Sequence, residues 1–543
     1  MRPDRDAGGL DAGGQGTSPP APPADRGAGA PRGLTARALG GMFWTFSGTG
    51  VQAAVQLLAI MALGRLLTPT EFGLMSAASV VVAFSQIVSQ IGVGPAIIQR
   101  KTLEPTHIRV AVTLSVALGT LLGMLVFFGA AEIATLYRIP ELEPILRAVA
   151  FLFPLDGLNT VAKSLLTRQL RFRLYIVLDV GSFILGYACV GVLLAWWGFG
   201  VWALVIANLA QQVIRTLSMY VATRHSLRPS FDLHAGRGLL SFGAGHSMAQ
   251  IGTLLSQQGD NMVVGRWLGP AALGIYGRAY NLLVMPATVF GRIVNRVLFP
   301  VMAQVQNERH RLVNAYERAV AVVALVSLPT SAFLWVVAPE FIPIVLGPAW
   351  GEVVMPFRLF SISLLFRMSS KISNACVKAA GRVYALAVFQ FVYAGLVVTG
   401  AIIGQHWGVG GVAVCVSVAM AFDWLNTAYL GRSVTGLTWR RFAAAHAPGL
   451  LLAVIIAGAA ALGAEAGRWA HLGNLLVFIV AGITSAAAAW VAAWLSPGVF
   501  LGPHGTWVRR QAEGLVLRGP RRGEPTEQAP VEELVGIGEG SPK

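Results

Sequence analysis

Between Met42 and Leu495 the chain is a succession of long apolar runs, separated by short polar or glycine-rich connections. Each run is long enough for the roughly 20 helical residues that cross the hydrocarbon core of a bilayer. The pattern therefore predicts an all-α polytopic membrane protein with about 14 transmembrane helices. The expected spans cover residues 42–67, 72–98, 108–136, 144–166, 173–199, 200–222, 238–268, 273–302, 316–346, 353–379, 383–406, 408–432, 447–466 and 472–495.

The count of fourteen spans leaves open an alternative that differs by one helical hairpin. Only glycine-rich turns separate spans five and six, at Gly198–Gly200, and spans eleven and twelve, at Gly408–Gly411. Spans four and ten are the most polar, so their hydropathic signal is the weakest.

Composition agrees with a chain that lies in a bilayer. The 543 residues are 55% hydrophobic and 12% charged, with a mean hydropathy of +0.64, whereas soluble proteins are about 45–50% apolar and about 25% charged. The net charge of +16 would indicate nucleic acid in a soluble protein, but basic loops at one membrane face explain it better here. The three cysteines lie inside apolar runs, so they predict neither a disulfide framework nor a zinc cluster.

Lysine and arginine set the expected orientation, because short loops rich in them are retained in the cytoplasm. With the N-terminus inside, the cytoplasmic connections receive most of these residues, among them Arg100, Lys101, Arg109, Arg168, Arg171, Arg224, Arg228, Arg309, Arg311, Lys378, Arg382, Arg440 and Arg441. The opposite connections carry little beyond Arg65, Arg138, Arg266 and Arg468. We therefore expect both termini to be cytoplasmic, with residues 1–33 and 497–543 as disordered tails.

The chain repeats itself weakly. At an offset of 201, residues 64–73 align with residues 265–274, with five of ten positions identical, and both copies join the first two spans of a half. At an offset of 211, Arg147 aligns with Arg358 and Arg171 with Arg382. The alternative is that glycine and proline recur in any turn. A real repeat of six spans predicts two parallel pseudo-symmetric six-helix lobes, 34–222 and 223–435, followed by two C-terminal helices in 436–496.

Two stretches carry a resemblance to a known family. GRLLTPTEFGLMSAA at 64–78 and DNMVVGRWLGPAALGIYGRAYNLL at 260–283 resemble the polysaccharide-transporter (Wzx-type) oligosaccharide flippases, which belong to the multidrug/oligosaccharidyl-lipid/polysaccharide exporter superfamily. The resemblance covers roughly residues 36–435. It implies twelve core helices in two lobes, location in the bacterial inner membrane, and export of undecaprenyl-diphosphate-linked glycans by alternating access. It also implies a polysaccharide polymerase and glycosyltransferases as partners.

A polar stripe follows span seven and has a counterpart in span one. His246, Gln250, Thr253, Gln257 and Asp260 lie within about 40° of one helical line, and the repeat maps them onto Thr45, Thr49, Gln52, Gln56 and Ala59. The stripes either hold helices together by hydrogen bonds or line a wet central cavity. We assign Gln52, Gln56, Gln250 and Gln257 to substrate binding.

Asp260 is the only carboxylate of the span-seven stripe. A charge at membrane depth costs about 2.5–3.5 kcal/mol and persists for a function or a partner. Asp260 is therefore either a proton or cation site that couples transport to an ion gradient, or half of an ion pair with Arg278. Asp156, Asp179 and Asp423 are weaker candidates, better explained by packing.

Arginines form further stripes in the second half of the chain. Arg278, Arg292 and Arg296 lie within about 40° of one line in span eight, and span ten carries Arg367, Lys371, Asn374 and Lys378. Arginine suits phosphate because its planar fork binds two oxygens and stays charged. We expect Arg278, Arg292 and Arg367 to bind a diphosphate, whereas Arg296, Lys371 and Lys378 are better explained by snorkelling.

Absent motifs narrow the function further. No lysine lies in a G-x-x-x-x-G-K-[ST] context, so ATP is not expected as energy source, and no cofactor is implied. The sequence predicts a flippase rather than an enzyme. A drug or metabolite antiporter of the same superfamily remains the first alternative, with an acidic cavity as its expected mark. A membrane glycan polymerase or ligase is the second, but the external connections are short.

Overall fold

The computed structural model describes residues 34–89, 93–100, 102–230, 232–503 and 505–506, and of these it leaves aside the side chains of 34–49, 84–89, 95, 233–251, 293, 296 and 297. The first half of this part is helical from end to end. Its elements are α1 (Leu34–Leu66), α2 (Pro69–Ser89), α3 (Val93–Gln99), α4 (Pro105–Phe128), α5 (Ala130–Tyr137), α6 (Leu142–Val149), α7 (Leu152–Arg168), α8 (Phe172–Ser182), the π-helix η1 (Phe183–Cys189), α9 (Val190–Trp196) and α10 (Val201–Thr223).

The second half continues in the same way. Its elements are α11 (Leu233–Ile293), the π-helix η2 (Val294–Leu298), α12 (Phe299–Gln304), α13 (Arg309–Val345), the 3₁₀ helix η3 (Pro348–Val353), α14 (Val354–Ile362), α15 (Leu364–Ala379), α16 (Val383–Gly404), the 3₁₀ helix η4 (Gln405–Trp407), α17 (Gly408–Thr435), α18 (Trp439–Trp469), α19 (Asn474–Leu495) and α20 (Pro497–Phe500). The expected tail at 497–543 thus begins with a short helix, α20. The expected tail residues 1–33 and 507–543 lie outside the described part.

The predicted all-helical membrane fold is confirmed. Within the described residues, eight helical stretches are long and apolar enough to cross a membrane, and Gly50–Leu66 and Pro69–Ala83 are shorter apolar helices. One of the eight, 53 residues long, contains both α16 and α17, which pack against each other as a hairpin. These helices are consistent with fourteen expected spans, although length and composition do not fix the number.

α11 contains two expected spans and reverses direction inside its range. Gly269 has a φ of 85° and a ψ of 179°, which is not helical. The hydroxyl of Tyr276 lies 2.6 Å from the carboxylate of Asp260, yet 16 residues of straight helix would place them about 24 Å apart. The chain therefore folds back at Gly269, where a residue without a side chain adopts the positive φ at no steric cost.

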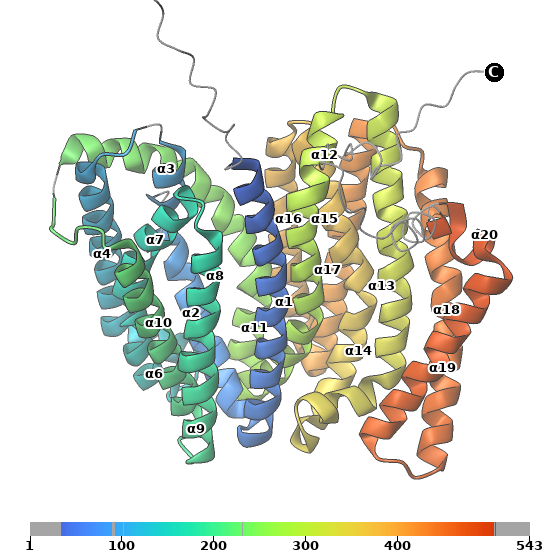
Figure 1. Cartoon of the computed structure of the whole chain (residues 1–543). Helices are drawn as coiled ribbons and strands as arrows, with labels where there is room; N and C mark the ends of the chain where they lie inside the picture. The colour runs from blue at the N-terminus through green and yellow to red at the C-terminus, as the bar shows by residue number, and fades with distance from the viewer. Residues whose placement is uncertain (1–33, 90–92, 101, 231, 504, 507–543) are drawn as a thin grey trace, which may run out of the picture.

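The helices form two lobes with α1 and α11 between them (Figure 1). The first lobe, on the left, contains α2 and α4–α10, and the second contains α13–α17. We call the end where α1 stops at Leu66 the lower end, as it appears in Figure 1, and the end where α1 starts the upper end. The largest buried cluster includes residues of both lobes, so the apolar packing continues across their junction.

Matching backbone breaks in the two lobes support the internal repeat. Arg171, just before α8, has φ −84° and ψ 49°, and Arg382, just before α16, has φ −85° and ψ 49°. The preceding residue has a positive φ in both cases, 55° at Leu170 and 77° at Gly381. The most polar spans are broken at equivalent places too, between α6 and α7 and between α14 and α15. Because these angles recur at the offset of 211, chance recurrence of turn residues does not explain them.

The lobes touch most closely where α2 crosses the second half of α11. A Cβ added to Gly73 would lie 1.7 Å from the carbonyl oxygen of Pro270, and one added to Gly274 would lie 1.8 Å from that of Pro69. The offset of 201 maps Gly73 onto Gly274 and Pro69 onto Pro270, so it turns one contact into the other. This is expected for a crossing that lies on a pseudo-two-fold axis. Only glycine allows two backbones to approach this closely.

The two C-terminal helices are attached to the second lobe through α13. Glu317 of α13 forms an ion pair of 2.5 Å with Arg441 at the start of α18. Glu340 forms one of 2.8 Å with Arg468 near the end of α18. These pairs fix α18 near both of its ends, and α19 packs on α18.

We expect Gly73→Ala to destabilise the protein by at least about 1–3 kcal/mol, because the added methyl group meets backbone atoms that have no room to move. Thermal unfolding in detergent measures the change. Gly482→Ala in α19 is the matched control, since a Cβ there meets open space, and its expected effect is neutral to slightly stabilising. Equal unfolding temperatures for Gly73→Ala and the parent protein would contradict the close crossing.

Candidate functional site

The polar stripes of α1 and α11 have the same burial pattern. Gln52 and Thr253 are half-buried, Gln56 and Gln257 are exposed, and Ala59 and Asp260 are buried, each pair related by the offset of 201. An exposed amide on an apolar helix of a membrane protein has to meet water or a polar ligand. Gln56 and Gln257 thus mark the polar faces of α1 and α11. The side chains of Thr45, Thr49, His246 and Gln250 lie outside the described residues.

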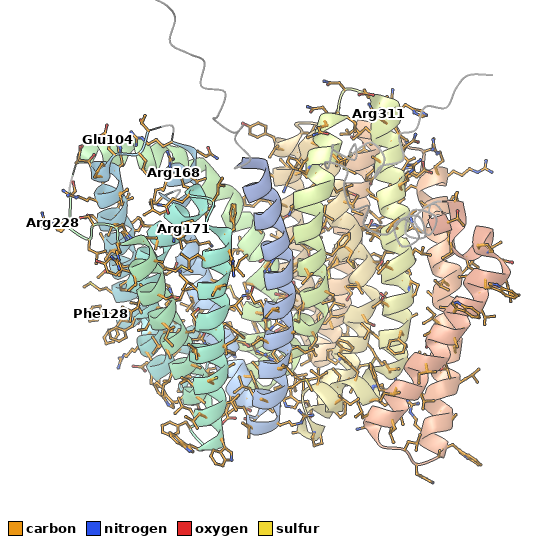
Figure 2. The ribbon with its side chains drawn as sticks, viewed as in Figure 1. Glu104, Phe128, Arg168, Arg171, Arg228 and Arg311 are labelled. Carbon is orange, nitrogen blue, oxygen red and sulfur yellow. The ribbon has the colours of Figure 1, made fainter. Side chains whose placement is uncertain are left out.

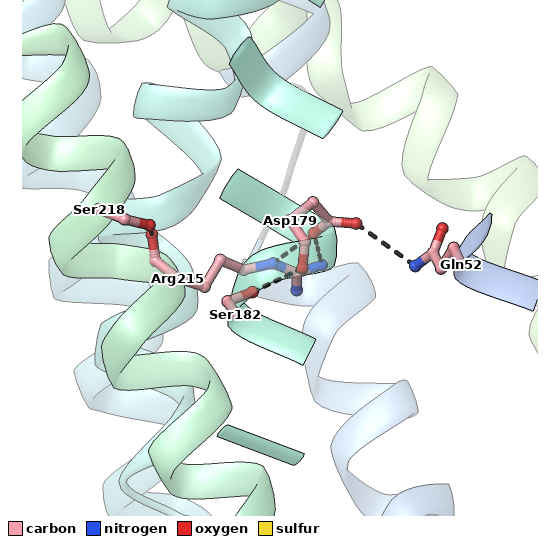
Figure 3. A network of polar contacts seen from close by, with 5 residues as sticks. All are labelled: Gln52, Asp179, Ser182, Arg215 and Ser218. Atoms are coloured by element: carbon pink, nitrogen blue, oxygen red, sulfur yellow. Dashed lines mark hydrogen bonds and ion pairs between the residues drawn. The ribbon is translucent and has the colours of Figure 1, made fainter. Parts of the chain in front are cut away.

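A polar network connects α1, α8 and α10 in the first lobe (Figure 3). The guanidinium group of Arg215 binds the carboxylate of Asp179 through Nε at 2.7 Å and through a second contact from Nη2. Gln52 Nε2 donates to the other carboxylate oxygen at 3.5 Å. The sequence interpreted Asp179 as a packing residue, whereas the structure places it in an ion pair whose carboxylate side chain is 11% exposed.

In the second lobe, the buried carboxylate of Asp260 has neutral partners in place of a cation. Asp260 is fully buried, and its carboxylate accepts hydrogen bonds from the hydroxyl of Tyr276 at 2.6 Å and from the backbone N–H of Asn261 at 2.8 Å. Of the two alternatives for Asp260, the ion pair with Arg278 is therefore not the one that the structure forms. The turn at Gly269, between the expected spans seven and eight, brings Tyr276 opposite Asp260, whereas Arg278 packs on the ring of Phe72 in the first lobe.

Arg367 lies in the interior of the second lobe, close to Asp260. Its Nη1 donates to the hydroxyl of Tyr280 at 2.7 Å, and its guanidinium carbon lies 5.1 Å from the centroid of that ring. Tyr276 and Tyr280 stack on each other, and Phe360 presents its edge to both. The aromatic packing holds the two hydroxyl groups in place, one on the carboxylate and one on the guanidinium group.

Arg278 lies at the junction of the lobes. Its guanidinium carbon is 4.3 Å from the ring centroid of Phe72, which belongs to α2 of the first lobe. Its Nε is buried and donates no hydrogen bond. A cation on an aromatic ring is stabilised by about 0.5–2 kcal/mol, but the ring offers no lone pair to the N–H groups. Arg278 therefore keeps donor capacity beside the crossing of α2 and α11.

The exposed polar residues of α11 extend away from Arg278 along one face. At 100° per residue, these side chains lie within about 80° of arc, and the set consists of Arg278, which is half-buried, and the exposed Asn281, Thr288 and Arg292. The expected site residue Arg292 is on this face, and Arg367 is not, because it points into the second lobe toward Tyr280. The side chain of Arg296 lies outside the described residues.

Sequence reasoning missed three residues of these networks: Arg215, Tyr276 and Tyr280. Arg215 could have been found, because two intramembrane charges of opposite sign in consecutive spans are expected to pair. The tyrosines gave no such signal, since aromatic residues are common in apolar spans. Among the described residues, no group of three or more His, Cys, Asp or Glu side chains could hold a metal ion.

Comparison with known proteins identifies the family. Residues 62–355, more than half of the chain, match the family described as "Polysaccharide biosynthesis protein". The chain belongs to this family. It is 26% identical over 352 residues to the lipopolysaccharide biosynthesis protein WzxC of Escherichia coli (strain K12), covering 64% of this chain and 71% of that protein. It is 30% identical over 311 residues to the succinoglycan biosynthesis transport protein ExoT of Rhizobium meliloti (strain 1021), covering 57% and 62%.

Solved structures of other proteins share the fold. The lipid II flippase MurJ in an inward closed conformation superimposes with a TM-score of 0.66 and 12% identity, covering 83% of this chain and 98% of that one. An inward-facing multidrug resistance MATE family transporter of the MOP superfamily gives a TM-score of 0.57 at 17% identity, covering 73% and 95%. These likenesses and the apolar helices show that this family member is a multi-pass membrane protein with the fold that these two structures share.

We expect Arg215→Gln to destabilise the protein by about 3–5 kcal/mol, because it leaves the Asp179 carboxylate buried without its cation. The double variant Asp179→Asn/Arg215→Gln removes both charges and should regain most of that loss. Thermal unfolding in detergent measures both. Arg147→Gln is the control, since its ion pair with Glu143 joins two more exposed side chains and is worth at most about 1 kcal/mol. A double variant no more stable than Arg215→Gln would refute a structural ion pair.

Proposed function

We propose that the protein is a flippase that moves an undecaprenyl-diphosphate-linked oligosaccharide, the repeat unit of a polysaccharide, from the inner to the outer leaflet of a bacterial cell membrane. Membership in the polysaccharide biosynthesis family supports this. Two relatives, WzxC and ExoT, are named for lipopolysaccharide biosynthesis and succinoglycan transport. The teichuronic acid biosynthesis protein TuaB of Bacillus subtilis (strain 168) is 28% identical over 353 residues. Glycosyltransferases and a polymerase are the partners that such a pathway requires.

The observation that carries the proposal is the cationic face of α11. Arg278 keeps a buried donor without a hydrogen bond at the lobe junction, and Arg292 is exposed on the same side of the helix. Guanidinium groups bind phosphate oxygens in a fork and stay charged at any physiological pH. The exposed amides of Gln56 and Gln257 on α1 and α11 offer hydrogen bonds suited to sugar hydroxyls.

The sign of the exposed charge argues against a drug or metabolite cation antiporter. Such a transporter needs accessible carboxylates, but Asp179 and Asp260 are buried and already accept hydrogen bonds. Where side chains of α1 and α11 are described, from residue 50 and from residue 252 onward, the exposed polar ones are amides, Thr288 and arginines. An anionic substrate suits this arrangement better than a cationic one.

The distribution of basic residues supports a cytoplasmic upper end. Arg168, Arg171, Arg228 and Arg311 all lie there (Figure 2). Lysine- and arginine-rich loops stay on the cytoplasmic side during insertion. With this orientation both termini are cytoplasmic, and the lower end, where the lobes cross, faces outward. The lobes are then closed on the outside, in line with the inward conformations named for both structural neighbours.

Energy coupling is assigned to Asp260. A proton or a cation on its carboxylate changes the cost of burying it, so the two access states acquire different free energies. The first lobe has Ala59 at the equivalent position, and its own carboxylate, Asp179, is neutralised by Arg215. Asp260 lacks such a pair, since Tyr276 donates only a hydroxyl.

Replacing Arg278 or Arg292 by Ala should lower the affinity for undecaprenyl diphosphate at least about tenfold, the equivalent of one lost charge-assisted contact of about 1.4 kcal/mol or more. Lysine at either position should restore binding only in part, because it lacks the fork. Binding of undecaprenyl diphosphate and undecaprenol to the purified protein is compared by native mass spectrometry. Arg228→Ala, at an exposed loop arginine, is the control. Unchanged diphosphate binding in both Ala variants removes these arginines from the site.

Asp260→Asn should leave a folded protein that binds undecaprenyl diphosphate but no longer responds to an imposed ion gradient. The carboxamide oxygen still accepts the hydrogen bond from Tyr276, while the exchangeable charge is gone. Flipping of a fluorescent undecaprenyl-diphosphate glycan in proteoliposomes, with proton and sodium gradients imposed separately, measures the response. Tyr276→Phe is the control, because it removes the hydrogen bond and keeps the carboxylate. Gradient-driven flipping by Asp260→Asn at the parent rate excludes Asp260 as the coupling site.

A further inference from the structure

The repeated Gly-Arg pair reaches across the lobe junction in both halves of the chain. Arg65, at the end of α1, donates from Nη2 to the carbonyl oxygen of Ile344 in α13 of the second lobe at 2.7 Å. Arg266, its equivalent at the offset of 201, donates from Nη1 to the carbonyl oxygen of Leu136 in α5 of the first lobe. We call the two turns that begin with Gly64-Arg65 and Gly265-Arg266 corners. The corner of the first half of the chain thus contacts the second lobe, and the corner of the second half contacts the first lobe.

Both arginines bind the same part of a helix. Ile344 is the last residue but one of α13, and Leu136 is the last residue but one of α5. The final carbonyl groups of a helix have no partner within it and carry the negative end of its dipole. A guanidinium group therefore satisfies a free acceptor and neutralises partial charge in one contact. The arginine side chains serve as caps for helices of the opposite lobe.

The glycines of the two pairs make this approach possible. A Cβ on Gly64 would lie 2.9 Å from the carbonyl oxygen of Leu346, and a Cβ on Gly265 would lie 2.9 Å from Cε1 of Tyr137. Any larger residue would push each corner away from the helix end that its arginine caps. Gly64 also accepts a hydrogen bond of 2.7 Å from Nε1 of the fully buried Trp350, so the first corner is held twice.

These contacts lie at the lower end together with the crossing of α2 and α11. Any motion that separates the lobes there breaks both arginine contacts, because donor and acceptor are on opposite sides of the opening. A motion that separates the lobes at the upper end leaves them intact. The same five-residue identity that reveals the repeat in the sequence thus encodes a reciprocal contact in the structure.

We propose that Arg65 and Arg266, through the carbonyl groups of Ile344 and Leu136, are the gate residues that hold the outer side of the transporter closed while it loads substrate from the cytoplasm. We call this pair of contacts the clasp. The proposal rests on the proposed function and its orientation. Arg65 and Arg266 act by position and do not touch the substrate.

The test uses a single cysteine just beyond the crossing. Ser76 faces Gly277 of α11, whose Cβ would lie 3.5 Å from its hydroxyl, so Ser76→Cys reports whether the lower end is open. Cys189, Cys376 and Cys415 are replaced by Ala, and a membrane-impermeant maleimide is added outside intact spheroplasts. Arg65→Gln/Arg266→Gln should raise the labelling rate of position 76 at least about tenfold, and each single variant should raise it less.

Two further variants keep the result interpretable. Arg65→Lys/Arg266→Lys retains donors for the carbonyl groups and should raise labelling less than the Gln pair. If the Gln pair does not accumulate, the two single Gln variants replace it. Arg138→Gln, an exposed arginine at the same end, should leave labelling unchanged. A merely stabilising role would lower abundance without opening position 76. Parent labelling rates in an abundant Arg65→Gln/Arg266→Gln protein, or in both single Gln variants, overturn the clasp.

Failure of the proposed function is recognised separately. Leu170→Cys, an exposed position at the upper end beside Arg171, should resist the external reagent. If it is labelled from outside, the orientation is wrong. The lower end then faces the cytoplasm, and the clasp is tested with the reagent added to the medium around inverted vesicles, which expose their cytoplasmic face. Labelling at position 76 requires no substrate, so it reports on the gate even if the transported lipid is of another kind.

Discussion

The contact on which the rest of the structure depends is the crossing of α2 and the second half of α11 at Gly73 and Gly274. Each glycine packs directly on the carbonyl of a proline that starts the other helix, Pro270 and Pro69. Because the two contacts exchange under the repeat, the crossing is an axis of pseudo-symmetry as well as a point of closest approach. Any larger residue at Gly73 or Gly274 would push the two helices apart. Arg65 and Arg266, which lie just before the crossing in each half of the chain, would then lose their contacts with the ends of α13 and α5.

The same symmetry makes the differences between the lobes informative. In the first lobe the buried carboxylate of Asp179 has a full cation, Arg215, and a closed ion pair has little reason to exchange protons or ions. In the second lobe Asp260 has a hydroxyl and a backbone N–H, with Arg367 near but bound to Tyr280. The buried carboxylate of Asp179 thus has a cation as its partner, whereas that of Asp260 has a hydroxyl and a backbone N–H. This difference supports the proposal that energy coupling lies in the second lobe rather than in the first.

The sequence predicts the helical spans and the equivalent positions of the two halves, but it does not predict which side chains meet. Hydropathy predicted the helical spans because each must satisfy its backbone inside a bilayer. The offset of 201 paired Gln56 with Gln257 and Ala59 with Asp260, and in the structure the first pair is exposed and the second is buried. Side-chain partners were harder. The partner of Asp260 depends on how the chain reverses at Gly269, and the partner of Arg278 is an aromatic ring in the other lobe. Helical periodicity carries no information across such a reversal or between lobes.

The clasp is not equally strong on its two sides, and this predicts an order of opening. The corner at Gly64 is held by Arg65 and by Trp350, which also packs its ring edge-on against Phe72. The corner at Gly265 has Arg266 alone on a backbone carbonyl, with its guanidinium group resting on the exposed ring of Trp267. The stretch after α5, Arg138–Glu141, contains no tryptophan to complete the symmetry. A hydrogen bond within a buried contact contributes about 0.5–1.5 kcal/mol, so the Gly265 corner releases α5 before the Gly64 corner releases α13.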